Sequence, residues 1–162
     1  MLLELNIENI ALIESLRIEF GQGLNVLTGE TGSGKSIVVD CVNLVLGGRA
    51  ERDLVRTGAE KGRVQALFDV SGCAPARALA EELGADCEDG LLAVSRELSR
   101  GGRNVCRVSG AIVPLSALRR LTGMLMDIHG QHEHQSLLNP ARHIDFLDAF
   151  GDAGHARSEE HT

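Results

Sequence analysis

Apolar and polar residues alternate along the start of the chain, in the runs LLELNIE (2–8) and IESLRIEF (13–20). Side chains of a β-strand point alternately to the two faces of a sheet, so this period of two predicts two half-buried strands. RVQALFDV (63–70) predicts a third strand. The runs LLAVSRELS (91–99) and NVCRVSG (104–110), separated by RGGR, predict a hairpin with glycines at its turn.

A different pattern follows the first two strands. LNVLTG (24–29) predicts a short apolar strand that leads directly into a glycine-rich segment. KSIVVDCVNLVL (35–46) is apolar on nearly every side, which is typical of a helix buried beneath a sheet. Gly47 and Gly48 end this helix, because glycine favours the backbone conformation of a helix C-terminus.

Three further helices and one strand complete the pattern. PARALAEELG (75–84) and VPLSALRRLTG (113–123) each have proline near the start and glycine at the end, as short helices do. MLMDIHG (124–130) predicts a strand, and ARHIDFLDAF (141–150) predicts a final helix. The succession indicates a mixed α/β fold, and 162 residues suffice for one domain with a real core.

Composition narrows the class of protein. No apolar run approaches the roughly 20 residues that a membrane helix needs, and the four cysteines form no CxxC pair, which favours a reduced, cytosolic protein. The net charge of −7 argues against a chain that coats nucleic acid along its whole surface. Residues 96–120 are nevertheless locally basic. This stretch is interpreted either as a solvated hairpin or as a contact to DNA. It contains Arg96, Arg100, Arg103, Arg107, Arg119 and Arg120 against the single acid Glu97.

Residues 29–36 read GETGSGKS and match the phosphate-loop pattern G-x-x-x-x-G-K-[ST] at every fixed position. Glycines let successive backbone N–H groups point into one concavity, and the helix that follows adds its free N–H groups and positive dipole end. Lys35 would reach the β- and γ-phosphates, and the Ser36 hydroxyl would ligate Mg²⁺. The segment is therefore interpreted as a nucleotide-binding loop.

The lysine in this loop is unusual for the chain. Of 16 basic residues, only Lys35 and Lys61 are lysines. A compact ammonium on a flexible stem enters a tight phosphate cradle that a planar guanidinium does not, so the lysine is interpreted as required there.

Groups for hydrolysis are harder to find. Asp127 ends the apolar run MLMD, but its predicted strand continues through Ile128, which makes it a weak candidate for a Mg²⁺ ligand. His129, His132 and His134 follow closely. Their spacing matches no zinc signature and no cysteine lies nearby, so a polar loop facing the nucleotide is favoured over a metal site.

Two segments together carry a family resemblance. LNVLTGETGSGKSIVVDCVNLVLGGRA (24–50) with MDIHGQHEHQSLL (126–138) resembles the RecN family of bacterial DNA repair proteins, which are SMC-like ATPases related to ABC-type ATPases. The opening of the chain and RTGAEKGRV (56–64) are similar to it too. The resemblance covers roughly residues 1–150, and HGQHEHQ is its most specific part.

The resemblance implies the N-terminal lobe of an ABC/SMC-type P-loop NTPase head, with a mixed sheet around the buried P-loop helix. Gln131 is then the expected Q-loop glutamine, which touches Mg²⁺ or the attacking water, with Gln135 as the alternative. Residues near Asn9 to Leu12 are expected to border the adenine. The implied ligands are ATP and Mg²⁺, with Ser36 and Gln131 at the metal. The implied nucleotide-binding residues are Gly29, Glu30, Thr31, Gly32, Ser33, Gly34, Lys35, Ser36 and Gln131.

The sequence also departs from the family. It contains no LSGGE-like signature, no apolar run ending in paired acids and no heptads. Residues 1–150 are therefore interpreted as half of a head, and 151–156 as the start of a coiled coil or linker. Residues 157–162 (RSEEHT) match the translation of a sequencing adapter, are treated as an artefact and are excluded from this reasoning. ATPase activity is assigned to the full-length parent, and for the fragment alone we expect weak nucleotide binding with negligible hydrolysis.

The leading hypothesis is an ATP-binding lobe that acts in DNA double-strand-break repair and recombination, in the bacterial cytoplasm and at the nucleoid. Its expected partners are the C-terminal head lobe with its coiled coil, a second head and DNA, with no membrane. A P-loop small-molecule kinase is an alternative, in which the arginine hairpin would serve as a lid. A non-enzymatic module that binds DNA or a partner through the Arg96–Arg107 hairpin is another. An ABC transporter subunit fits the HGQHEHQ segment poorly.

Overall fold

The sheet dominates the structure, which is a computed structural model that describes residues 1–29, 34–50 and 52–128. The predictions for residues 30–33, for Gln131, Gln135 and the neighbouring histidines, for the helix at 141–150 and for residues 151–162 lie outside the described residues. Met1–Met126 form one compact unit.

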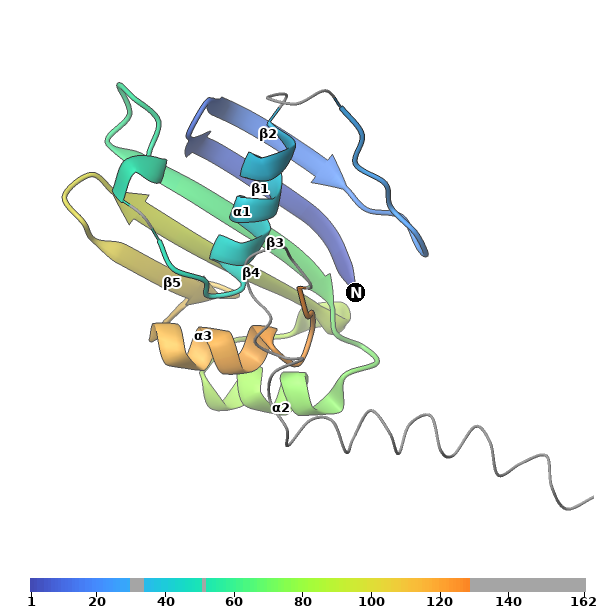
Figure 1. The fold of residues 1–162 in the computed structure, drawn as a ribbon. Helices are drawn as coiled ribbons and strands as arrows, with labels where there is room; N and C mark the ends of the chain where they lie inside the picture. Colours follow the sequence, from blue (N-terminus) through green and yellow to red (C-terminus); the bar gives the residue numbers. More distant parts are fainter. Residues whose placement is uncertain (30–33, 51, 129–162) are drawn as a thin grey trace, which may run out of the picture. The chain divides into compact units, whose positions relative to one another are not determined.

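Six antiparallel strands form one sheet in the order β2-β1-β3-β4-β5-β6 (Figure 1). All strands expected at 2–8, 13–20, 63–70, 91–99 and 104–110 are present, and the three-residue strand β6 was not predicted. Their bounds are β1 Leu2–Ile10, β2 Ile13–Glu19, β3 Lys61–Asp69, β4 Leu91–Ser99, β5 Asn104–Val108 and β6 Ala111–Val113. The expected α/β fold is confirmed, with every pairing among the described strands antiparallel.

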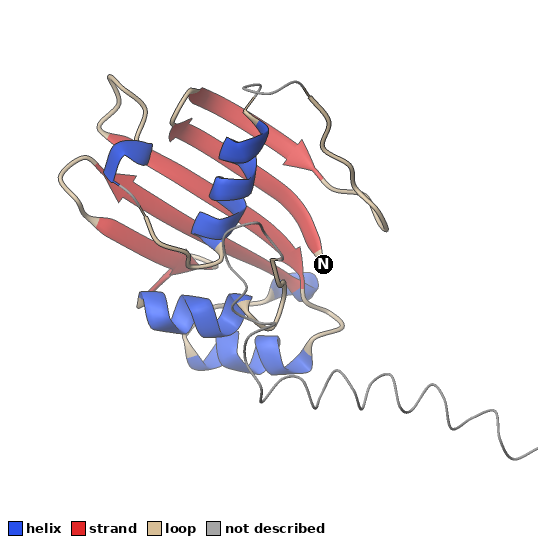
Figure 2. Ribbon diagram, viewed as in Figure 1, coloured by secondary structure: helices blue, strands red, loops and turns tan. Residues whose placement is uncertain are grey.

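In the described part of the chain, three helices accompany the sheet: α1 Lys35–Val45, α2 Ala74–Glu82 and α3 Leu115–Thr122. Helix α1 lies across one face of the sheet and packs against β3 and β4 (Figure 2). Helices α2 and α3 pack against each other, and α3 also contacts β5. Two single 3₁₀ turns, Arg52–Leu54 and Glu88–Gly90, were not predicted.

The strand register lines up apolar side chains on the face that α1 covers. Leu5 pairs with Ala66, which pairs with Val94, and all three side chains are buried. The next row is Leu16, Ile7, Val64, Arg96, Cys106 and Val113. Alternation along the strands sends the intervening side chains to the opposite face. A single arginine thus stands in an apolar row that faces the helix.

Helix α1 is less buried than its sequence predicted. Val38, Cys41, Leu44 and Val45 are buried, but the side chain of Val39 is 47% exposed. Among the described residues, α1 packs mainly on the sheet, against β3 and β4, so its outer face stays open. The prediction that the helix is buried all round was wrong for the part of the chain that the structure describes.

Two predicted strands do not form. Residues 24–29 have no regular secondary structure and pair with no described strand, and Leu24, Val26 and Leu27 are 90%, 70% and 50% exposed. An apolar run becomes a strand only where a neighbouring strand accepts its backbone hydrogen bonds. Residues 124–128 are turn and loop, because the N–H groups of Met124 and Leu125 donate to the last carbonyls of α3 instead.

All four cysteines are free thiols, and their burial predicts their reactivity. Burial, with a smaller effect from Asp40, raises the pKa of Cys41 to about 12, so only roughly one molecule in ten thousand carries that thiolate at pH 8. We expect iodoacetamide to modify the half-buried Cys73 first and to spare Cys41 until the protein unfolds. Peptide mass spectrometry over time checks this order. Alkylation of Cys41 in folded protein as fast as that of Cys73 would contradict it.

Candidate nucleotide-binding site

The first turn of α1 carries the described part of the predicted phosphate loop. Gly34 precedes the helix with φ 93°, a left-handed conformation that glycine adopts without strain. Its carbonyl accepts the first helical hydrogen bond, from Val38 N at 3.1 Å. The amides of Lys35, Ser36 and Ile37 therefore have no acceptor within the helix, as at every helix N-terminus.

The charge around this turn suits an anion. The first turn of α1 contains no acidic residue, and no side chain of the described residues caps it. Within the described residues Lys35 forms no ion pair, and Ser36 is exposed. Free amides, the positive end of the helix dipole and an ammonium group at one place can hold phosphate oxygens. Of the predicted site residues, the structure brings Gly34, Lys35 and Ser36 together.

The opposite end of α1 is held by side chains that the sequence analysis did not assign to the site. Arg96 on β4 donates from Nη1 to the carbonyl oxygen of Leu44 at 2.9 Å and to that of Gly48. Arg119 on α3 donates from Nε to the carbonyl of Gly47 at 2.6 Å. Thr122 Oγ1, also on α3, lies 2.8 Å from the carbonyl oxygen of Leu46 and 2.9 Å from that of Leu118, and its one hydroxyl proton is shared between these two acceptors. We call Arg96, Arg119 and Thr122 the α1 clamp.

Arg96 is the largest fully buried side chain described, with 1% of its surface exposed. Its Nε donates to Asn104 Oδ1 at 3.0 Å, and no carboxylate among the described residues forms an ion pair with it. Burial lowers the pKa of this guanidinium. Carbonyls at the negative end of the α1 dipole are its electrostatic partners. Its place in the alternation L-x-V-x-R-x-L was a signal that this arginine faces inward.

The six arginines of residues 96–120 do not form the single basic patch that the sequence suggested. Arg96 and Arg119 bind carbonyls at the end of α1. Arg107 pairs with Ser95 and therefore lies on the opposite face of the sheet from Arg96. Arg100 donates from Nη2 to the carbonyl of Arg56 at 3.2 Å, at the tip of the β4–β5 hairpin. Alternation along the strands thus separates Arg96 from Arg107, which a DNA contact along the hairpin would need on one surface.

The β1–β2 turn contains the residues expected near the adenine. Asn9 and Ala11 have φ values of 51° and 50°, and Leu12 is 82% exposed. The turn is fastened to the segment after α1, since Ala11 N donates to Leu54 O at 2.7 Å and Arg56 N donates to Asn9 O at 2.9 Å. Contact with a base stays a prediction.

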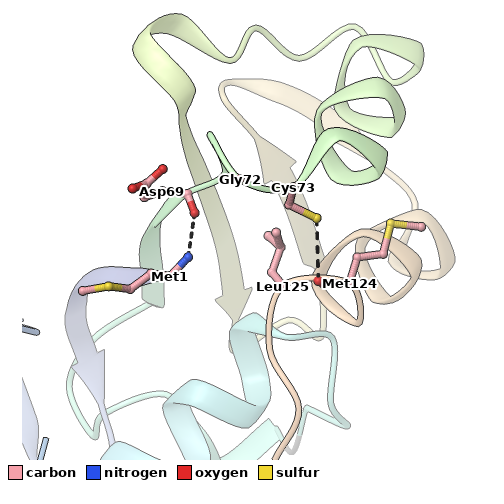
Figure 3. Close-up of a pocket in the computed structure, with 6 residues that line it drawn as sticks. All are labelled: Met1, Asp69, Gly72, Cys73, Met124 and Leu125. Carbon is pink, nitrogen blue, oxygen red and sulfur yellow. Dashed lines mark hydrogen bonds between the residues drawn. The ribbon is translucent and has the colours of Figure 1, made fainter. Parts of the chain in front are cut away.

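A cavity of about 340 Å³ has a lining that does not include Gly34, Lys35 or Ser36 (Figure 3). Across it, the N-terminal amine of Met1 donates to the carbonyl of Asp69 at 2.6 Å. The lining residues are Met1, Asp69, Gly72, Cys73, Met124 and Leu125. None of them is a predicted nucleotide contact, so this cavity is not the candidate site.

Comparison with known proteins first defines the class. Residues 4–74 match the family model described as an AAA domain. A structure from work on ATP-driven dimerization and DNA-stimulated activation of SMC ATPases superposes with a TM-score of 0.67 at 18% identity, covering 92% of this chain and 98% of that one. An SMC head bound to the C-winged helix domain of ScpA gives 0.62 at 22% identity, covering 78% and 41%. The fold is that of the N-terminal lobe of an SMC-type ATPase head.

Proteins named RecN are similar to this chain at higher identity. DNA repair protein RecN of Halalkalibacterium halodurans is 45% identical over 150 residues, covering 93% of this chain and 26% of the relative. RecN of Bacillus subtilis is 42% identical over 153 residues, covering 94% and 27%. The chain is homologous to the N-terminal part of RecN, which confirms the resemblance seen in the sequence. It spans about a quarter of the length of these relatives.

No helix among the described residues is long and apolar enough to cross a bilayer.

Proposed function

We propose that the chain is the ATP-binding N-terminal lobe of a RecN-like ATPase that acts in DNA double-strand-break repair and recombination. The observation that carries the proposal is the first turn of α1. Its backbone amides are free, and Gly34, Lys35 and Ser36 of GETGSGKS lie in that turn. The identity of 36–45% to proteins named RecN supports the same function.

The residues of this lobe would bind and orient the nucleotide. The amides at the start of α1 and the Lys35 ammonium hold phosphate oxygens, and the Ser36 hydroxyl is a suitable oxygen ligand for Mg²⁺. Bound Mg²⁺ neutralises charge that develops on the phosphates. Glu30, Thr31, Gly32 and Ser33 would complete the loop from Gly29, and Gln131 would contact the metal or the attacking water.

The nucleotide-binding site requires further protein segments to be complete. The exposed apolar residues Leu24, Val26, Leu27 and Val39 flank the phosphate loop on both sides, which supports a C-terminal head lobe as their partner. A coiled coil, a second head and DNA are the further proposed partners, in the bacterial cytoplasm at the nucleoid. SMC heads and the RecF–ATP structure share the fold of this lobe. We propose that the lobe alone binds ATP weakly and hydrolyses it negligibly.

The alternatives have less support. A kinase lid or a DNA-binding hairpin would need the arginines of residues 96–107 on one accessible surface. Arg96 is buried, and Arg107 projects from the opposite face of the sheet. RecN homology and the SMC-type fold instead favour the repair ATPase.

The two lysines of the chain provide a matched test. Lys35→Ala is expected to weaken Mg²⁺–ATP binding by roughly 10- to 100-fold, because a charge-assisted hydrogen bond to phosphate is lost. Lys61→Ala removes the same charge from an exposed strand position, where the ammonium pairs with Glu97 at 3.0 Å, and is expected to leave affinity unchanged. Isothermal titration calorimetry measures both. Equal affinity of the wild type and Lys35→Ala would refute the proposed site.

A further inference from the structure

Helix α1 connects two ends of different chemistry. Its N-terminal turn is the candidate phosphate site, and its C-terminal carbonyls are bound by the α1 clamp. We propose that Arg96, supported by Arg119 and Thr122, is a positioning residue of the nucleotide site that fixes how α1 lies on the sheet. This inference rests on the proposed function and adds a residue that touches neither phosphate nor metal.

The apolar contacts of α1 do not by themselves define its position. Val38, Cys41 and Leu44 rest on β3 and β4, and burial of apolar surface is not directional. A helix of 11 residues is about 16 Å long, so a small rotation or tilt at its C-terminus displaces the phosphate-binding turn. Directional hydrogen bonds at the C-terminus restrict that rotation and that tilt.

The clamp restrains α1 from two independent elements. Arg96 reaches the helix from the centre of the sheet, in the row that contains Val64 and Cys106. Arg119 and Thr122 reach it from α3, which packs on β5. Their donors serve the consecutive carbonyls of Leu46, Gly47 and Gly48 together with that of Leu44. Restraints from two directions hold the end of a helix more firmly than either would alone.

The local sequence allows this close approach. Gly47 has φ 95°, and a Cβ atom added there would collide with Cγ of Arg119. A Cβ at Gly48 would lie 2.7 Å from the carbonyl oxygen of Asn43. The pair of glycines therefore brings the carbonyls after α1 within reach of the α3 side chains. The guanidinium of Arg96 binds two of the carbonyls from Nη1 and the side chain of Asn104 from Nε, a planar arrangement of two donor nitrogens that the single nitrogen of lysine does not reproduce.

The test compares Arg96→Lys with Arg107→Lys. Arg107 lies on the neighbouring strand β5 and faces the other side of the sheet, so the second variant is a matched control. Calorimetry with Mg²⁺–ATP is performed on samples shown to be folded by circular dichroism. We expect Arg96→Lys to weaken binding about tenfold and Arg107→Lys to leave it unchanged. Hydrogen exchange should show faster exchange of the α1 amides in Arg96→Lys, with the amides of β1 and β3 unaltered.

A role in stability alone predicts something else. It predicts a lower free energy of unfolding with the same ATP affinity in the folded fraction, and that result would overturn the inference while the proposed function stands. Failure of the wild type to bind Mg²⁺–ATP would overturn the proposed function and this inference together.

A milder variant covers the case in which Arg96→Lys does not fold. Thr122→Val keeps the side-chain volume and removes the hydrogen bond to Leu46, and about threefold weaker binding is expected. Wild-type affinity in Thr122→Val, together with unchanged exchange of the α1 amides, would also overturn the inference.

Discussion

Arg96→Met is expected to lower the free energy of unfolding by about 2 kcal/mol. Methionine fills much of the same space but donates no hydrogen bond, so the carbonyl of Gly48 loses its donor. The carbonyl of Leu44 keeps the backbone N–H of Gly47, and the exposed side chain of Asn104 can bind water instead. Each buried acceptor left unpaired costs about 1–3 kcal/mol. Removal of a buried cation offsets part of this cost, because the guanidinium no longer has to be desolvated. Urea unfolding followed by circular dichroism measures the difference.

Arg103→Met is the control for this substitution. Arg103 is exposed at the turn of the β4–β5 hairpin, and the same change there is expected to alter stability by less than about 0.5 kcal/mol. If Arg96→Met proved as stable as the wild type, the hydrogen bonds of Arg96 would contribute no net stability, and the burial of this arginine would need another cause.

Phe68→Ala is expected to cost about 4 kcal/mol. Phe68 is fully buried on β3 and lies between Leu2 and Leu92 on the neighbouring strands. Truncation of its ring removes apolar contact and leaves a cavity that the surrounding strands do not fill. Leu67 precedes it on the opposite face of the sheet and is only half-buried, so Leu67→Ala should cost about 1 kcal/mol.

The contrast between these neighbours tests the register of the sheet. A shift of one residue would exchange the faces of β3 and place Leu67 inside. Thermal unfolding of the two variants beside the wild type decides the point. A larger loss for Leu67→Ala than for Phe68→Ala would show that the register described above is wrong.

The sequence predicted the strands well where their pattern was local. The alternation in β1, β2 and β3 and the hairpin of β4 and β5 could be read directly, because a strand with one buried face shows it every second residue. The helices α2 and α3 were equally clear from proline at the start and glycine at the end. The short strand β6 was missed, because three residues carry too little of any period.

The two strands that were predicted but not formed show the limit of such patterns. LNVLTG at 24–29 has the composition of a buried strand. A buried strand, however, also needs neighbouring strands that hydrogen-bond its backbone N–H and C=O groups. The described sheet supplies no partner there, and the apolar side chains remain exposed. At 124–128 the last carbonyls of α3 accept hydrogen bonds from the backbone amides. A pattern of residue types does not reveal these bonds.

By itself the sequence determined the class of this protein and its candidate phosphate site. The spacing of GETGSGKS places glycines, lysine and serine at the start of a helix, and these are properties of neighbouring residues. Only the tertiary structure decided the role of Arg96. In the sequence it was one of six arginines within a basic stretch, but the pairing of β4 with β3 turns it toward α1. The carbonyls it binds lie 48 and 52 positions earlier in the chain, so no local pattern joins them to Arg96.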